Sequence, residues 1–543
     1  MRRIFKNSKQ MLVIITGLII LVASCKKDPI PVTAISLDKT TATIQVGANL
    51  TLTPFISPTD ADNKKVDWES ADPTVATVSN GVVTGVALGT TIITAMSHED
   101  PTIKATCSFL VTPSTGQVIE ISGDITENTT WYSAAKYMLS GFVYVKNNAE
   151  LTIQPGTLIK GVSGTKAALI IERGAKIMAA GTSSAPIIFT SDKPKGQRAS
   201  GDWGGVVLCG KATTNKHDNG TGVGVAEGGI GSNYGGTDDA DNSGILQYVR
   251  IEFPGIPLTA TANSEINGLT LYSVGTGTTI DHIQVSYSGD DSYEWFGGTV
   301  NCKYLVCMRG LDDEYDTDNG FRGKLQFLFG IRDPNVSDQS GSNGFESDND
   351  ADGSTLTPTT KPIFSNVTLY GPLTVSETLP ANHLFKRAMH IRRSSQLSVY
   401  NSVFVGWPVG LLLDGTLGNT PIAAENNDLQ IENCIMAGMT ANYAETTGTP
   451  ATPYTIVQTE AYYTAPARGN AINTLAEIIG GSLISLTDPT LLPDAGSPVL
   501  TGASFTNSNL TDSFFTPVAY KGAFGTTDWT AGWCNFDPQN TDY

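Results

Sequence analysis

Acidic residues are concentrated in one stretch of this 543-residue sequence. Positions 290 to 352 hold fourteen Asp and Glu residues against five Lys and Arg, which accounts for half of the net charge of −18. Closely spaced carboxylates raise one another's pKa unless a cation neutralises them. Ca²⁺ takes about six to eight oxygen ligands from Asp, Glu, Asn and backbone carbonyls. We interpret the stretch as a candidate Ca²⁺ site; solvated turns that use Asp and Asn for their geometry are the alternative.

The acids recur in a fixed setting, because an aromatic residue precedes an acid three times. These pairs are Tyr293-Glu294, Tyr315-Asp316 and Phe345-Glu346, and each follows a turn-like segment with further acids or Asn. The predicted metal ligands are Asp290, Asp291, Glu294, Asp312, Asp313, Asp316, Asp318, Glu346 and Asp348. We also consider Tyr293, Trp295 and Tyr315 as rings for sugar stacking, with burial in the core as the alternative.

Apolar residues in the same region recur with a period of 21. The predicted columns are Ile283, Tyr304 and Leu325; Val285, Val306 and Phe327; and Tyr287, Met308 and Phe329. Alternation of apolar and other residues predicts strands with one buried face. Recurrence near 20 residues predicts one strand per turn of a solenoid, with rungs roughly 4.8 Å apart. The sequence therefore predicts a parallel β-helix.

Basic residues beside the acids suggest catalysis. If the apolar columns point inward, His282, Lys303 and Lys324 form an outer column, and Arg322 lies close by. Acidic Ca²⁺ ligands beside a Lys or Arg resemble the layout of polysaccharide lyases on β-helices. That resemblance implies that the cation binds a uronate carboxylate and that the basic residue removes a proton. Lys324, Lys303 and Arg322 are thus candidate catalytic residues; solvated or ion-paired lysines are the alternative.

Paired carboxylates could instead hydrolyse glycosides. Arg322-Gly323-Lys324 is similar to the Arg-x-Lys element of polygalacturonase-type enzymes, but the Gly-His element of those enzymes is missing. His390 and Arg392-Arg393 are expected to form a separate basic spot on the surface.

The composition predicts an all-β protein. Charged residues make up only 16% of the chain, Gly is abundant at 56 residues, and short β-branched runs are frequent. The acidic balance argues against a nucleic-acid partner, which would require clustered Lys and Arg.

The N-terminus has the features of a targeting segment. A basic region and an apolar stretch precede Val22-Ala23-Ser24-Cys25, which resembles a bacterial lipobox. We expect residues 1–24 to be a lipoprotein signal peptide, Cys25 to be lipidated and 25–31 to be a tether. The following Lys26-Lys27-Asp28 is similar to surface-export signals of Bacteroidota lipoproteins. This predicts a protein anchored by lipid in the outer membrane and exposed at the cell surface.

Residues 32–112 contain short strands at the spacing of a β-sandwich. Trp68-Glu69-Ser70, Val75-Ala76-Thr77-Val78 and Gly81-Val82-Val83-Thr84-Gly85 make this segment similar to the bacterial Ig-like group 2 family. Members of that family usually serve as spacers or adhesive modules.

Residues 118–543 resemble right-handed parallel β-helix lipoproteins of Bacteroidota. The resemblance rests on elements such as Gly201-Asp202-Trp203-Gly204-Gly205 and Glu294-Trp295-Phe296-Gly297-Gly298. The Gly-, Asn- and Asp-rich stretch 214–243 predicts a long loop, with cation binding and simple mobility as the two alternatives. From about 440 to 543 we expect a cap, with the aromatic tail around Trp529 and Trp533 covering the open end of the solenoid.

The predicted fold class is all-β, an N-terminal Ig-like β-sandwich followed by a right-handed parallel β-helix. The favoured function is a cell-surface lipoprotein that binds a polymer with divalent cation assistance, and a glycan is the favoured ligand. A carbohydrate-active enzyme, either a polysaccharide lyase or a glycoside hydrolase, is the alternative. A structural subunit that contacts other outer-membrane proteins is the second alternative.

Overall fold

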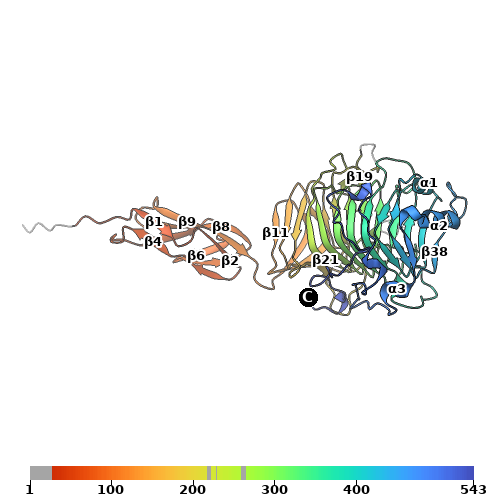
Figure 1. Ribbon diagram of the computed structural model, residues 1–543. Coiled ribbons are helices and arrows are strands. Elements are labelled where there is room, and N and C mark those ends of the chain that lie inside the picture. Colours follow the sequence, from red (N-terminus) through yellow and green to blue (C-terminus); the bar gives the residue numbers. More distant parts are fainter. Residues whose placement is uncertain (1–26, 217–221, 228, 258–264) are drawn as a thin grey trace, which may run out of the picture. The chain divides into compact units, whose positions relative to one another are not determined.

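The computed structural model describes residues 27–216, 222–227, 229–257 and 265–543. They divide into two compact units between Ser114 and Thr115 (Figure 1). The signal peptide and Cys25 lie outside the described residues. The strands of the first unit are β1 (Ala34–Leu37), β2 (Thr41–Gln45), β3 (Asn49–Thr51), β4 (Pro54–Ser57), β5 (Val66–Ser70), β6 (Ala76–Ser79), β7 (Val82–Gly85), β8 (Gly89–Ser97) and β9 (Lys104–Thr112).

The first unit is a β-sandwich, as predicted. One sheet has the order β2-β9-β8-β5, a second has the order β3-β7-β6, and β1 pairs with β4. Along β8 the residues alternate, with Ile93 and Ala95 wholly buried and Ile92 exposed. Ile93 and Phe109 from one sheet share a core with Val83 from the other. Two sheets with such inner faces must stack, because neither can bury its apolar side alone.

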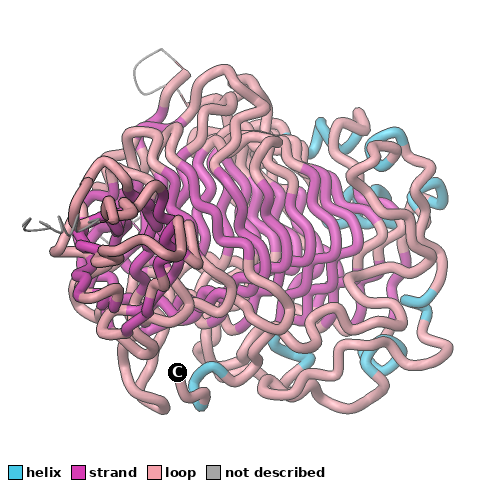
Figure 2. The backbone as a smooth tube through the Cα atoms, turned by 90° about the vertical axis from the view of Figure 1, so that its left-hand side faces the viewer, coloured by secondary structure: helices cyan, strands magenta, loops and turns pink. Residues whose placement is uncertain are grey.

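Among the described residues, the second unit contains 26 strands that form one continuous sheet. Strands one turn apart along the chain pair in parallel, so they form stacked rungs (Figure 2). The strands are β10 (Val118–Ile125), β11 (Thr129–Trp131), β12 (Lys136–Val145), β13 (Glu150–Ile153), β14 (Leu158–Gly161), β15 (Ala168–Ile171), β16 (Lys176–Ala180), β17 (Ile187–Ser191), β18 (Gly205–Cys209), β21 (Gly244–Glu252), β24 (Leu269–Tyr272), β25 (Thr279–Ser286), β26 (Tyr293–Phe296), β27 (Cys302–Met308), β28 (Tyr315–Asp318), β29 (Lys324–Ile331), β30 (Phe345–Ser347), β31 (Ile363–Tyr370), β32 (Arg387–Ile391), β33 (Ser398–Tyr400), β34 (Val403–Val405), β35 (Val409–Leu413), β36 (Ile431–Glu432), β37 (Ile435–Ala437), β38 (Ala441–Tyr443) and β39 (Ala471–Asn473). This is the predicted parallel β-helix.

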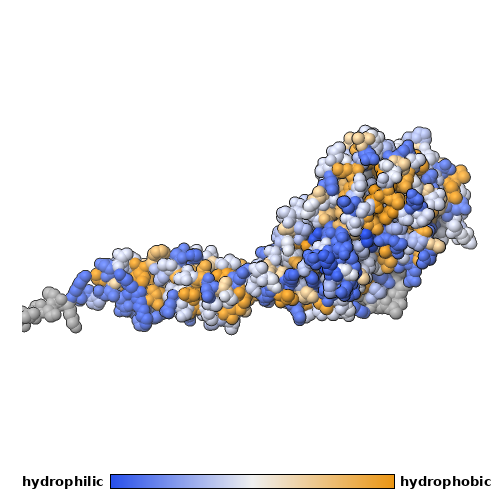
Figure 3. All heavy atoms as spheres, turned by 90° about the horizontal axis from the view of Figure 1, so that it is seen from below, coloured by the Kyte–Doolittle hydropathy of each residue, from blue (hydrophilic) through white to orange (hydrophobic). Residues whose placement is uncertain are grey.

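The second unit also contains smaller elements outside the large sheet. They are the hairpins β19 (Gly224–Val225) with β20 (Asn233–Tyr234) and β22 (Ile256–Pro257) with β23 (Glu265–Ile266), and the helices α1 (Thr420–Glu425), α2 (Ile456–Thr464) and α3 (Leu475–Ile479). The described part of the chain has no helix that is both long and apolar enough to span a membrane. On the face shown in Figure 3, hydrophilic residues gather in one patch of the second unit and hydrophobic residues remain exposed beside it.

The predicted 21-residue register is wrong in detail. Ile283 pairs with Leu305, and Leu305 pairs with Leu328, so successive rungs are 22 and 23 residues apart. A bend within each of these strands explains why the apolar columns were assigned incorrectly. His282, Tyr304 and Phe327 all have positive φ, at 56°, 57° and 63°, which interrupts the two-residue alternation. Their rings stack on one another outside the main hydrophobic cluster, with centroids 4.3 and 5.1 Å apart.

The aromatic tail does not cap the solenoid, contrary to the prediction. It runs back along the side of the rungs, where Trp529 packs edge-on against Tyr304 with ring centroids 5.2 Å apart. The hydroxyl of Tyr543 donates to Glu252 at 2.6 Å, which joins the last residue to β21. Near the C-terminal end of the solenoid, buried side chains of α1 and α2 join the main core instead (Figure 1).

Candidate functional site

An acidic cavity of about 490 Å³ opens on the β-helix. We call it the acidic cleft. Thirteen acidic and three basic side chains of the described residues line it. All nine predicted metal ligands are among them: Asp290, Asp291, Glu294, Asp312, Asp313, Asp316, Asp318, Glu346 and Asp348.

Three short strands place one row of these acids. In β26, β28 and β30, Glu294 pairs with Asp316 and Asp316 pairs with Glu346. The aromatic residue before each acid is wholly buried in the core, as Tyr293 and Tyr315 illustrate. Successive side chains of a strand point to opposite faces. The inward aromatic residues therefore direct the acids outward, one above another, into the cleft.

The turns before these strands place a second row. The Asp313 backbone N–H donates to the Asp291 carboxylate at 2.8 Å, and the Asn343 N–H donates to the Asp313 carboxylate one rung further. Buried Arg332 fixes the turn between them, because it donates to the Asp312 carbonyl at 2.7 Å and to the Glu314 carboxylate at 3.0 Å. The carboxylates are thus held in place before any ligand arrives.

Burial and neighbouring carboxylates raise the pKa of most acids in the cleft. Burial, followed by the charge of Asp290, raises the pKa of Asp291 well above its usual value. Burial and then Glu294 do the same to the pKa of Asp316. Burial raises the pKa of Asp312 to about 6. The pKa is also raised for Asp290, Glu294, Asp313, Asp318 and Asp348. These groups are costly to ionise together without a cation.

Basic residues stabilise one end of the cleft. Arg392 and Arg393 each donate to the Asp348 carboxylate at 2.7 Å, and Arg392 also pairs with Glu346. His390 is buried and lies 3.1 Å from Glu346. Burial disfavours the charge of Glu346, but Arg392 and His390 outweigh it and lower its pKa to about 2. The expectation of a separate surface spot is wrong, because β32 is the rung next to β30 and pairs His390 with Glu346.

The predicted catalytic residues lie elsewhere. Lys303 pairs with Gln326 and not with Lys324, so the expected basic column does not exist. Lys303 donates to the Thr516 hydroxyl at 2.9 Å, and Lys324 forms an ion pair with Asp512. Both lysines therefore contact the C-terminal tail.

Arg322 is also outside the acidic cleft as its lining residues define it. It forms an ion pair with Asp239 at 3.2 Å. The predicted column of basic residues is wrong because it depended on the 21-residue register.

The predicted sugar-stacking rings are not accessible. Tyr293, Trp295 and Tyr315 are all fully buried. The Tyr293 hydroxyl donates to the Ile283 carbonyl at 2.8 Å, inside the solenoid. The alternative reading of these rings as core residues is therefore correct.

Other lining residues were not named individually from the sequence. Asn215, Lys216 and Glu227 come from the long loop, and Glu265 and Asn267 come from the segment before β24. Asn267 had a detectable signal. It stands two residues before Leu269, which pairs with Tyr293, so it occupies the rung position of Asp291 one turn earlier. The contribution of the long loop had no periodic signal.

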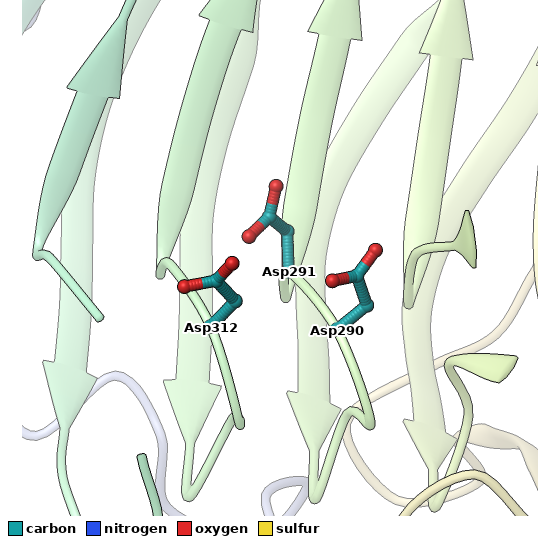
Figure 4. A group of neighbouring side chains, drawn as sticks. All are labelled: Asp290, Asp291 and Asp312. Atoms are coloured by element: carbon teal, nitrogen blue, oxygen red, sulfur yellow. The ribbon is translucent and has the colours of Figure 1, made fainter. Parts of the chain in front are cut away.

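The chemistry of the cleft fits a hard cation. Asp290, Asp291 and Asp312 each place one carboxylate oxygen within 4.8 Å of the others (Figure 4). Asp291, Glu294 and Asp316 form a second group of the same kind. Oxygens on opposite sides of a Ca²⁺ ion are roughly 4.6–5.2 Å apart, since each lies about 2.3–2.6 Å from the metal. The carboxylate spacing therefore suits Ca²⁺ without rearrangement of the backbone.

A parallel β-helix with an acidic cleft on its flank, preceded by an Ig-like sandwich, is the class of protein that these features define. The chain belongs to the family described as pectate-lyase like beta helix domain, which matches residues 123–478. Residues within 31–107 match the bacterial Ig-like domain (group 2). Both predicted domain types are thereby confirmed.

Similarity to individual proteins covers short segments. An uncharacterized protein of Clostridium acetobutylicum is 32% identical over 93 residues, which is 17% of this chain and 10% of that protein. An Ig-like virion protein of Serratia phage KSP90 is 45% identical over 72 residues, 13% of this chain and 28% of that protein. A 3-O-alpha-D-galactosyl-alpha-L-arabinofuranosidase of Bifidobacterium longum is 45% identical over 60 residues, 11% of this chain and 5% of that enzyme. This chain thus spans less than a third of each of these relatives.

Proposed function

We propose that the β-helix binds a glycan at the acidic cleft with the assistance of divalent cations, of which Ca²⁺ suits the oxygen donors best. The observation that carries the proposal is the convergence of thirteen acids on one cavity. Burial raises the pKa of several of them. Their carboxylates are therefore poorly hydrated, and a bound cation would replace the missing water. Sugar hydroxyls or carboxylates would complete the coordination of such a cation. Membership of the pectate-lyase like family and the partial similarity to a glycoside hydrolase support a carbohydrate ligand.

Retention on immobilised glycans tests this proposal. The full chain, stripped with EDTA, is passed over uronate polymers and neutral polysaccharides with and without Ca²⁺. We expect retention that requires Ca²⁺ and that is weakened at least tenfold by Asp316→Asn. The matched control is Glu377→Gln, which removes an exposed acid outside the cleft. Retention that is indifferent to both chelator and Asp316→Asn would refute the proposal.

A polysaccharide lyase is the second candidate function. The observation that favours it is the position of Lys216. This lysine lines the acidic cleft, whereas Lys303 and Lys324 contact the tail. A lyase needs a basic group beside a cation that stabilises the developing charge. Turnover of a uronate polymer would release unsaturated products that absorb in the near ultraviolet. Loss of that absorbance in Lys216→Ala, with glycan retention intact, would support the enzyme over the binder.

We also propose that Cys25 anchors the protein to the outer membrane by lipid and that the β-helix faces the cell exterior. The lipobox-like Val22-Ala23-Ser24-Cys25 supports the anchor. A surface location would bring the acidic cleft to extracellular polymers.

A further inference from the structure

The two groups of carboxylates in the acidic cleft share one residue. Asp291 belongs to the group with Asp290 and Asp312 and also to the group with Glu294 and Asp316. Figure 4 shows Asp291 standing between Asp290 and Asp312 on neighbouring turns. Glu294 and Asp316 project from the strands that follow these turns, β26 and β28. The two groups therefore approach Asp291 from different elements.

We propose that the acidic cleft holds two divalent cations of the Ca²⁺ class, one in each group, with the Asp291 carboxylate bridging them. The first ion takes Asp290 and Asp312 from the turns, and the second takes Glu294 and Asp316 from the strands. This inference rests on the cation dependence of the proposed function, and it is independent of which glycan binds.

Unsatisfied oxygens in both groups support two ions. One carboxylate oxygen of Asp312 and one of Asp316 are buried and have no hydrogen-bond partner among the described residues. Asp312 and Asp316 belong to different groups, so a single ion held by one group would leave the oxygen of the other residue unsatisfied. A buried acceptor without a partner is destabilising, because it has lost its hydrogen bonds to water. An ion in each group would supply the missing partner of each oxygen.

Asn267 gives an independent indication for the second ion. Its side chain is 2% exposed and lines the acidic cleft. The amide nitrogen donates to the Glu294 carboxylate, while the amide oxygen has no hydrogen-bond partner in the part of the chain that is described. Amide oxygens are ordinary Ca²⁺ ligands. Asn267 thus both orients Glu294 and offers a neutral oxygen beside the second group.

The charge of the cleft is consistent with more than one ion. Three basic side chains line it against thirteen acids, and Arg392 and Arg393 are engaged at the far end with Asp348. One divalent ion would leave much of this charge unneutralised in a partly buried site. Two adjacent ions, sharing a carboxylate, lower the repulsion around Asp291 from both sides.

Calcium stoichiometry tests the proposal. Isothermal titration and equilibrium dialysis of the EDTA-stripped full chain should give two Ca²⁺ per molecule. Asp312→Asn should remove one ion and Asp316→Asn the other, because each variant loses the negative charge that balances its ion, so each variant binds one. Asp291→Asn should weaken both by at least tenfold. The control Glu377→Gln should retain two.

Thermal melting in EDTA shows whether each variant is folded, and anomalous scattering from crystals soaked with a lanthanide locates the ions. Two peaks flanking Asp291 are expected. One ion in the unaltered protein, or loss of the same single ion in both Asp312→Asn and Asp316→Asn, would overturn the two-ion site and leave cation-dependent glycan binding in place. Absence of any bound ion would overturn both proposals. Two ions without Ca²⁺-dependent glycan retention would overturn only the proposed function.

Discussion

Replacing Asp312 by Asn should stabilise the metal-free protein at neutral pH. Burial raises the pKa of this carboxyl from 3.8 to about 6 in the folded state. A difference of one pKa unit corresponds to about 1.4 kcal/mol. The shift of about two units therefore gives a destabilisation of about 3 kcal/mol when Asp312 is ionised. Asn keeps the shape and can still accept the 2.8 Å hydrogen bond from the Ser340 hydroxyl.

The sign of the pH dependence follows from the direction of the shift. The folded pKa of Asp312 lies above the unfolded value, so the folded protein binds the proton more tightly. Below about pH 4 the carboxyl is protonated in both states and costs nothing. The destabilisation develops between about pH 4 and 6 and is fully present above it. The advantage of Asp312→Asn should follow the same profile.

Chemical denaturation in EDTA at a series of pH values from 4 to 7 measures this difference. At pH 7 we expect the free energy of unfolding of Asp312→Asn to exceed that of the unaltered protein by up to about 3 kcal/mol. Ca²⁺ should narrow or reverse this difference in stability, because the variant lacks one negatively charged ligand and binds the ion less tightly. Glu377→Gln should change stability by less than about 0.5 kcal/mol. An equal gain at pH 4 and pH 7, or no gain at either, would refute the electrostatic reasoning.

Three other changes test the rest of the molecule. Lys324→Ala should cost less than about 1 kcal/mol, because it removes a half-exposed ion pair with Asp512, and glycan retention should be unchanged; a variant that loses retention would show that our placement of this lysine is wrong. Trp529→Ala should cost about 2–4 kcal/mol and expose the C-terminal tail to limited proteolysis, since the ring packs against Phe524 and Tyr304; an unchanged proteolysis pattern would argue against the tail as a clamp. Cys25→Ser should release the protein from membranes or leave the precursor unprocessed, and normal membrane fractionation would contradict the lipid anchor.

The acidic row could be predicted because local alternation survives in its strands. In β26 and β28, Tyr293 and Tyr315 point inward and the next residue points outward, as the two-residue period requires. The longer insertion before Phe345 is absorbed by a loop and leaves the pairing of Asp316 with Glu346 intact. Aromatic–acid pairs therefore gave the correct neighbours even though the overall period was misjudged.

The basic residues could not be placed because two long-range effects decide their surroundings. Tyr304 has a φ of 57°, and no sequence pattern marked this residue as a bend. Lys303 and Gln326 both contact Thr516, which lies 213 and 190 residues further along the chain, respectively. The tail thus converts an apparently open face of the solenoid into a covered one. Periodicity predicts which residues share a strand. It does not predict which distant segment of the chain covers them.

The same repeat that creates the acidic cleft also counteracts its instability. Each acid of the row Glu294 and Asp316 follows a fully buried tyrosine, and the two rings stack with centroids 5.6 Å apart. Burying a large apolar side chain contributes about 1.5–3 kcal/mol, which is comparable to the destabilisation from one ionised buried acid such as Asp312. Because the aromatic residue and the acid alternate on one strand, every rung that adds repulsion outside also adds packing inside. The scaffold can therefore hold a row of carboxylates in place before a cation binds, and the free energy released when their repulsion is relieved becomes available for binding.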